Sequence, residues 1–192
     1  RVVGPMLSHF GEVKVVDPGR RAIATTIRMM KVHTPGQKTI DEVAKFLEVK
    51  PSDTFKSLLY TADGSKEVVM AIMRGDHELN EVKLAHVLGA ASVHLATEAD
   101  VKAATGAEVG FAGPIGFKGK IYIDRAAALV RNGVSGANET DYHLANVNHG
   151  RDFEAEVVDV RQAQDGDLCP RCEDGRLHAY KGIEAGHIFV LG

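Results

Sequence analysis

An apolar run that ends abruptly in a charged run constrains the fold of this chain most strongly. Residues 68–72 are five consecutive apolar residues of β-strand type, and residues 74–81 hold five charged or titratable groups. Asn80 is a favourable helix N-cap, because its side chain can accept a hydrogen bond from an otherwise unsatisfied backbone N–H. The sequence therefore predicts a strand that leads through a charged turn into a helix.

Lys83 falls in the first turn of that predicted helix, where partial positive charge already gathers. A lysine at this end requires an anionic neighbour or an anionic ligand. An acidic neighbour in an exposed ion pair is the simpler explanation, since such pairs are common and weak. The acidic candidates for this pair are Asp76, Glu78 and Glu81.

Short helices and strands alternate along the chain, which predicts an α+β or mixed α/β domain. Thr39 and Glu42 have the spacing of a capping box at a helix that begins at Ile40. Residues 55–60 and 67–73 flank an Asp-Gly turn signal and predict a β-hairpin. Further strands are predicted at 92–96, 120–124, 142–148, 153–160 and 183–191, further helices after Thr97 and at 126–130, and a loop at 133–138.

Residues 110–116 contain three glycines and one proline, so they cannot form a regular helix or strand. Glycine lets backbone N–H groups approach a ligand closely, and consecutive N–H groups can bind an anion or an oxyanion. The stretch lacks the Gly-Lys-Ser/Thr ending of a phosphate-binding P-loop. A tight connection without any ligand is the alternative interpretation.

Cys169 and Cys172 are the two cysteines of the chain, and their Cys-x-x-Cys spacing resembles one knuckle of a zinc ribbon. Structural zinc takes four ligands. His178 and His187 could contribute, but their spacing fits no standard zinc pattern. We therefore predict no metal, with a zinc-ribbon interaction domain as the alternative. One close cysteine pair is not a secreted disulfide framework, so a cytoplasmic location is expected.

The composition is that of an ordinary globular protein, with 44% hydrophobic and 26% charged residues among 192. A net charge of −3 argues against a dedicated polyanion-binding module, although a local basic site stays open. No apolar segment is long enough to span a bilayer and no signal peptide is visible, so no membrane partner is expected. The chain begins with arginine, and we interpret it as a piece of a longer protein.

Several motifs occur in an order that resembles one known family. They are residues 34–36 with 39–40, 74–83, 110–114, 123–125, 136–138 with 142–143, and 181–192. Together they resemble the insertion (editing) domain of bacterial-type prolyl-tRNA synthetase, within the YbaK-like family of aminoacyl-tRNA deacylases. The resemblance implies an α+β fold with a mixed, mostly antiparallel, barrel-like sheet flanked by short helices.

The resemblance also implies a division of the chain and a function. Residues 1–33 would be a variable flank, 34–165 the editing domain, and 166–192 the Cys-x-x-Cys segment with a strand that returns to the synthetase core. The implied reaction is post-transfer editing, the hydrolysis of mischarged alanyl-tRNA-Pro by a domain of a proline–tRNA ligase. Alternatives are a non-catalytic insertion that binds the tRNA acceptor end or has a structural role, and a free-standing deacylase.

The implied partners are the 3′ acceptor end of tRNA-Pro carrying alanine and the rest of the synthetase chain, with a homodimeric parent enzyme. The resemblance implies no cofactor for the editing domain. ATP and Mg²⁺ would serve only the synthetase core, whose motifs are not recognisable in this sequence. The fragment is therefore not expected to activate proline.

Site roles follow from the same resemblance. Lys83 would be the editing lysine, a cation without a fixed partner that binds a phosphate of the tRNA 3′ end. His143 would orient the substrate and exclude larger ones, Asp124 would bind the amino group or organise the loop, and Gly113 would stabilise the oxyanion. A ribose hydroxyl of the tRNA can activate the water. The implied substrate-binding residues are Gly110, Ala112, Pro114, Ile115, Gly116 and Asn138.

Overall fold

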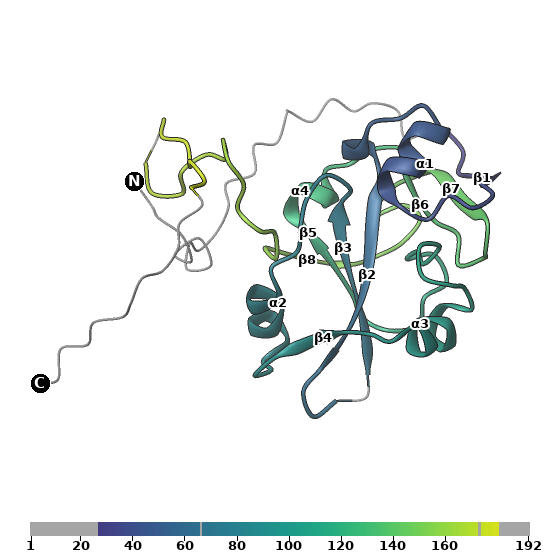
Figure 1. Cartoon of the computed structure of the whole chain (residues 1–192), viewed down its shortest axis with the longest axis horizontal. Coiled ribbons are helices and arrows are strands. Elements are labelled where there is room, and N and C mark those ends of the chain that lie inside the picture. The colour runs from purple at the N-terminus through teal and green to yellow at the C-terminus, as the bar shows by residue number, and fades with distance from the viewer. Residues whose placement is uncertain (1–26, 66, 173, 181–192) are drawn as a thin grey trace, which may run out of the picture. The chain divides into compact units, whose positions relative to one another are not determined.

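The structure is a computed structural model that describes residues 27–65, 67–172 and 174–180. The chain forms two compact units, one of residues 15–161 and one of residues 1–14 with 162–192. All helices and strands of the described residues lie in the larger unit (Figure 1). The strand predicted at 183–191, with His187, lies outside the described residues.

A five-stranded mixed sheet forms the centre of the larger unit. In spatial order its strands are β4 (Val93–Leu95), β2 (Phe55–Ala62), β3 (Val68–Arg74), β5 (Ile121–Asp124) and β8 (Glu156–Val158). β2 and β3 form the predicted antiparallel hairpin, in which Leu59 lies opposite Met70. β4 pairs antiparallel with β2, whereas β5 pairs parallel with both β3 and β8.

A second, three-stranded antiparallel sheet has the order β1 (Met30–His33), β7 (Tyr142–Val147) and β6 (Gly133–Gly136). A parallel bridge between Thr54 and Val134 links this sheet to the chain just before β2. The two sheets thus meet where β2 begins. The predicted α+β class with a mixed, mostly antiparallel sheet is confirmed.

Local capping signals in the sequence set where the helices begin and end. The helices are α1 (Ile40–Phe46), α2 (Glu81–Leu88), α3 (Glu98–Thr105) and α4 (Arg125–Ala128), with a 3-10 turn η2 at Pro51–Asp53. Thr39 and Glu42 make both hydrogen bonds of the predicted capping box. The Asn80 side chain accepts the Lys83 N–H at 3.1 Å, as expected of an N-cap. α3 ends at Gly106, as predicted.

β3 is buried on both faces, which explains why its sequence is continuously apolar. Met70 and Ile72 pack into one hydrophobic cluster together with Phe55. Ala71 and Met73 pack into a second cluster, on the side covered by α2. Burying one large apolar side chain contributes about 1.5–3 kcal/mol to stability. β3 buries three such side chains completely, Met70, Ile72 and Met73, and therefore contributes strongly to the stability of the unit.

Three predicted boundaries differ from the structure. The loop expected at 133–138 is largely a strand, β6, whose glycines allow close packing that the sequence alone does not reveal. The ring of Phe55 leaves no room for a Cβ at residue 133. β8 is shorter than the strand expected at 153–160. β1 pairs with β7 although it lies inside the expected flank 1–33.

Candidate active site

A cavity of about 520 Å³ opens beside the place where the two sheets meet. Its wall comes from the start of α1, the start of β2, the turn after β3, residues 109–112, and strands β6 and β7. Three of the predicted site residues line this cavity, namely Gly110, Ala112 and His143. The segments of the wall are far apart in the sequence, so the cavity exists only in the folded unit.

His143 on β7 is a buried, neutral side chain with little freedom to move. Its Nδ1 lies 2.7 Å from the hydroxyl of Thr34, which is fully buried. Burial lowers the pKa of His143, although a hydrogen bond from the ring to the Gly110 backbone opposes this effect. The ring also packs against Phe111, with 5.6 Å between centroids. Such an imidazole is suited to shaping a wall rather than to exchanging protons with water.

The side chain of Asn138 binds the backbone of the glycine-rich loop. Its Oδ1 accepts the Gly113 N–H at 2.7 Å, and its Nδ2 donates to the carbonyls of Gly113 and Ile115 at 2.9 and 2.8 Å. The Gly113 N–H is therefore satisfied inside the protein, which does not fit the oxyanion role expected for it. Pro114, Ile115 and Gly116 do not line the cavity either, so this half of the loop supports the wall from behind.

Gly113 and Gly136 pack backbone against backbone. A Cβ on Gly113 would lie 1.9 Å from the Gly136 carbonyl oxygen, and a Cβ on Gly136 would lie 2.2 Å from the Ala112 carbonyl oxygen. These distances are far below contact distance, so no larger residue fits at either position without a backbone shift. The close approach fixes Ala112, and with it one wall of the cavity.

Asp124 is a structural cap rather than a cavity residue. It is 2% exposed, and its carboxylate accepts the Ala126 N–H at 2.9 Å and the Val160 N–H at 3.3 Å. Burial raises its pKa, and the two N–H bonds only partly oppose that shift. Asp124 does not line the cavity, so the structure offers no contact for the expected binding of an amino group.

Lys83 has a fixed partner, so the expectation of a lysine without one is wrong. Its Nζ donates to Asp159 Oδ1 at 2.7 Å and to the Arg161 carbonyl at 3.1 Å. Both side chains of the ion pair are largely buried, at 15% and 12% exposure. Lys83 does not line the cavity. The anionic neighbour that a lysine needs at this helix end comes from the segment after β8, not from the nearby acidic residues considered above.

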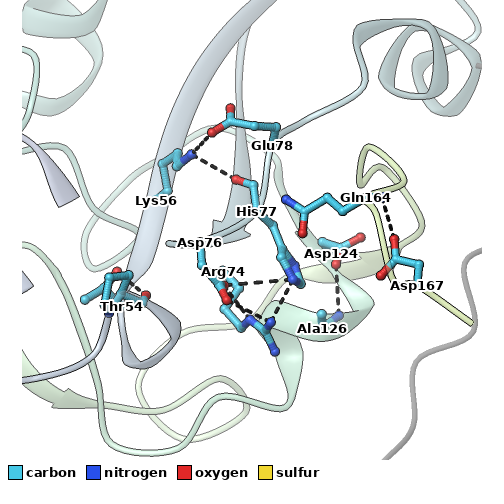
Figure 2. Close-up of polar contacts among 11 residues, drawn as sticks. Thr54, Lys56, Arg74, Asp76, His77, Glu78, Asp124, Ala126, Gln164 and Asp167 are labelled. Atoms are coloured by element: carbon cyan, nitrogen blue, oxygen red, sulfur yellow. Dashed lines mark hydrogen bonds and ion pairs between the residues drawn. The ribbon is translucent and has the colours of Figure 1, made fainter. Parts of the chain in front are cut away.

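Of the two lysines in this wall that the sequence analysis missed, Lys38 and Lys56, Lys56 is the less exposed. It lies near the start of β2 and lines the cavity beside Ser57. Figure 2 shows its ammonium group between the turn after β3 and the carboxylate of Glu78. A lysine at the second position of the predicted strand 55–60 was the available signal. The Ser57 hydroxyl is buried without a hydrogen-bond partner among the described residues.

The turn after β3 is rigid and carries further charge to the cavity. Arg74 makes a bidentate ion pair with Asp76, with N–O distances of 2.6 and 3.0 Å (Figure 2). Burial disfavours the carboxylate of Asp76, but the Arg74 guanidinium outweighs burial and lowers the pKa of Asp76. Asp76 and Glu78 both line the cavity. The lining of the cavity therefore combines two lysines, Lys38 and Lys56, with the carboxylates of Asp41, Asp76 and Glu78.

The Cys-x-x-Cys segment forms a tight turn in the smaller unit. The Cys169 N–H donates to the Gly175 carbonyl at 2.7 Å, and the Arg171 N–H points to the Cys169 sulfur at 3.4 Å. Within the described residues, no group of three or more His, Cys, Asp or Glu side chains is placed to hold a metal ion. Nor does any helix in the described part of the chain have the length and apolarity to cross a membrane.

Residues 34–153 match the family model described as the aminoacyl-tRNA editing domain. A proline–tRNA ligase of Geotalea daltonii is 50% identical over 165 residues, covering 85% of this chain and 29% of that protein. A proline–tRNA ligase of Thermoanaerobacter sp. strain X514 is 48% identical over 167 residues, covering 84% of this chain and 29% of the relative. The chain thus spans less than a third of the length of these relatives.

Solved structures share the fold. One, described as a candidate trans-editing enzyme for prolyl-tRNA synthetase, has a TM-score of 0.60 at 18% identity and covers 69% of this chain and 86% of that one. Another, the hypothetical protein APE2540, has a TM-score of 0.59 at 22% identity and covers 72% of this chain and 94% of the other. The fold and the match over residues 34–153 agree, and the chain therefore belongs to the aminoacyl-tRNA editing domain family.

Proposed function

We propose that this domain edits mischarged tRNA-Pro by hydrolysing the ester that joins alanine to the terminal adenosine. The observation that carries the proposal is the cavity in which Lys56 lies on one wall and His143 on another. Its proposed partners are the 3′ end of tRNA-Pro and the remainder of a proline–tRNA ligase chain. The ligase relatives supply the reason to choose tRNA-Pro.

A physical argument supports alanine as the amino acid. A pocket that admits proline cannot strongly exclude a smaller side chain, because one missing methylene changes binding by only ~1–3 kcal/mol. A second site that accepts small aminoacyl esters and sterically excludes proline corrects this error. The rigid wall of His143 and Ala112 is suited to such steric exclusion, since neither group can easily move aside.

Lys56 is the group that we propose to bind the phosphate of the terminal nucleotide. An ammonium group forms strong, charge-assisted hydrogen bonds to phosphate oxygens. Binding there would fix the nucleotide while the aminoacyl ester points toward His143.

The reaction needs a water, a proton acceptor and stabilisation of the tetrahedral oxyanion. The water oxygen attacks the ester carbonyl, the bond from that carbon to the ribose oxygen breaks, and the ribose oxygen takes up a proton. The Nδ1 of His143 is engaged by the Thr34 hydroxyl, and burial disfavours the protonated ring. We therefore prefer a neighbouring ribose hydroxyl as a proton relay: it receives a proton from the attacking water and passes its own proton to the leaving ribose oxygen.

Deacylation of alanyl-, cysteinyl- and prolyl-tRNA-Pro by the chain tests this function. We expect hydrolysis of alanyl-tRNA-Pro, survival of prolyl-tRNA-Pro, and loss of hydrolysis in Lys56→Met. Intact alanyl-tRNA-Pro at saturating protein would instead favour a domain that only binds the acceptor end. Hydrolysis of prolyl-tRNA-Pro at the alanyl rate would contradict the steric argument.

A further inference from the structure

We propose that Glu78 is an exchangeable counter-ion that occupies Lys56 while the cavity is empty and yields it to the phosphate of a bound nucleotide. This inference rests on the proposed function, since it concerns the anion that Lys56 receives. Glu78 would thereby act as a positioning residue: it keeps the lysine aimed at the cavity and sets how readily a nucleotide binds.

Lys56 has two acceptors of very different character. Its Nζ donates to the His77 carbonyl at 2.8 Å and to Glu78 Oε1 at 2.8 Å. The Lys56 side chain is 20% exposed, whereas the Glu78 side chain is 72% exposed. One bond therefore goes to backbone inside the protein, and the other goes to a carboxylate on a side chain that is mostly in solvent.

The backbone acceptor is held in place independently of Glu78. The His77 N–H donates to the Arg74 carbonyl at 2.8 Å, and the Arg74 guanidinium lies 2.7 Å from His77 Nε2. Asp76 fixes that guanidinium by its bidentate pair. Gly75 binds the start of β2 through its N–H, 2.9 Å from the Thr54 carbonyl. The His77 carbonyl therefore stays where it is when the Glu78 side chain swings away.

The chain after Glu78 is anchored as well. The Asn80 N–H donates to the Val160 carbonyl at 2.8 Å, and Leu79 bridges to Arg161. Rotation of the Glu78 side chain thus requires no movement of the turn or of α2. The structure separates a fixed half of the lysine site, the His77 carbonyl, from a replaceable half, the Glu78 carboxylate.

The energies favour exchange. An ion pair with an exposed partner contributes little to stability, because solvent screens it and the side chains lose freedom. A phosphate monoester carries more charge and more acceptor oxygens than a carboxylate, and a phosphodiester matches the carboxylate in both, so either can compete for the same ammonium group. A ligand without a phosphate cannot displace Glu78, so the ion pair between Lys56 and Glu78 stays intact when that ligand binds. Glu78 should therefore weaken phosphate binding slightly and leave neutral ligands unaffected.

Equilibrium binding of adenosine 5′-monophosphate and of adenosine tests the inference. We expect Glu78→Gln to raise the affinity for the nucleotide about two- to fivefold, the size of a weak surface ion pair, and to leave the affinity for adenosine unchanged. In a Lys56→Met background, Glu78→Gln should change neither affinity. With alanyl-tRNA-Pro, the effect of Glu78→Gln should appear as a lower KM.

Glu139→Gln is the matched control, because it makes the same change in net charge at the exposed Lys31–Glu139 pair, and neither of these residues lines the cavity. Equal gains in Glu78→Gln and Glu139→Gln would overturn the inference, since they would reflect general charge. No gain in Glu78→Gln, or an equal gain for adenosine, would also overturn it. Failure of the wild-type chain to deacylate alanyl-tRNA-Pro would instead refute the proposed function, and the nucleotide measurements would still decide the role of Glu78.

Discussion

Replacing Lys56 and Lys83 with methionine, one at a time, separates the two lysines that could serve editing. Methionine keeps most of the apolar stem and removes the ammonium group. Lys56 lines the cavity, and its side-chain partner Glu78 is largely in solvent. Lys83 forms a largely buried pair with Asp159 away from the cavity wall. The first change should therefore act on catalysis and the second on stability.

The expected sizes follow from these contacts. A hydrogen bond to a charged group contributes about 1.5–3 kcal/mol, so Lys56→Met should lower kcat/KM about 10- to 150-fold. Its exposed pair with Glu78 should change stability by less than about 1 kcal/mol. Lys83→Met removes the ammonium group from a carboxylate that is 12% exposed. We expect a loss of about 2–4 kcal/mol, near the lower end for buried pairs.

Deacylation kinetics and thermal unfolding of both variants provide the assay. Lys83→Met should lower the melting temperature by about 5–15 °C and retain activity below that temperature. Adding Asp159→Asn should restore part of the stability, because it removes the buried charge as well. A Lys83→Met protein that melts like the wild type but is inactive, beside an active Lys56→Met protein, would refute this reasoning and return the editing role to Lys83.

Three further outcomes are expected. Asn138→Gly keeps the positive φ of 54° accessible but removes three loop hydrogen bonds. We expect it to lower the free energy of unfolding in urea by about 2–4 kcal/mol. An unchanged midpoint would show that the loop keeps its conformation without these bonds. Gly136→Ala should cost about 1–3 kcal/mol, because the new methyl group meets the Ala112 carbonyl, and its melting temperature reports this. Burial lowers the pKa of His143, so the unfolded chain binds a proton first, and the unfolding free energy should fall as pH drops below about 6.5. His143→Gln should reduce that slope, and an identical slope in the variant would contradict the assignment.

Local signals predicted the helix ends and the central hairpin well. The capping box requires only residues 39 and 42, which lie in one helical turn. Asn80 caps α2 by accepting the N–H of Lys83, three residues further along the chain. The apolar run of β3 favours a central strand of a sheet, because such a run must be buried on both faces. The helix caps depend on contacts within a few residues, and the burial of β3 is indicated by its unbroken apolar sequence.

The cavity could not be predicted in the same way. β6 is rich in glycine, and only the Phe55 ring and the neighbouring carbonyls explain why small residues are required there. Asn138 in a loop pattern gives no sign that its side chain binds the Gly113 backbone. Both facts arise from contacts between distant segments, which become visible only when the sheets are assembled.

The choice of lysine shows the same limit most clearly. Lys83 stands out in the sequence because a cation at a helix N-terminus requires an anion. That requirement is met by Asp159, far along the chain. Lys56 gives a weaker local signal, yet strand pairing and the turn after β3 place it on the cavity wall.

The Asn138 side chain binds the main chain of the glycine-rich loop rather than its side chains. This affects how the sequence of the loop can vary among related domains. The three bonds go to an N–H and two carbonyls, groups that every amino acid except proline supplies in full. The side chain at Ala112, which lines the cavity, can then be exchanged while the path of the loop is preserved. Natural variation could thereby retune which aminoacyl group is tolerated without rebuilding the scaffold.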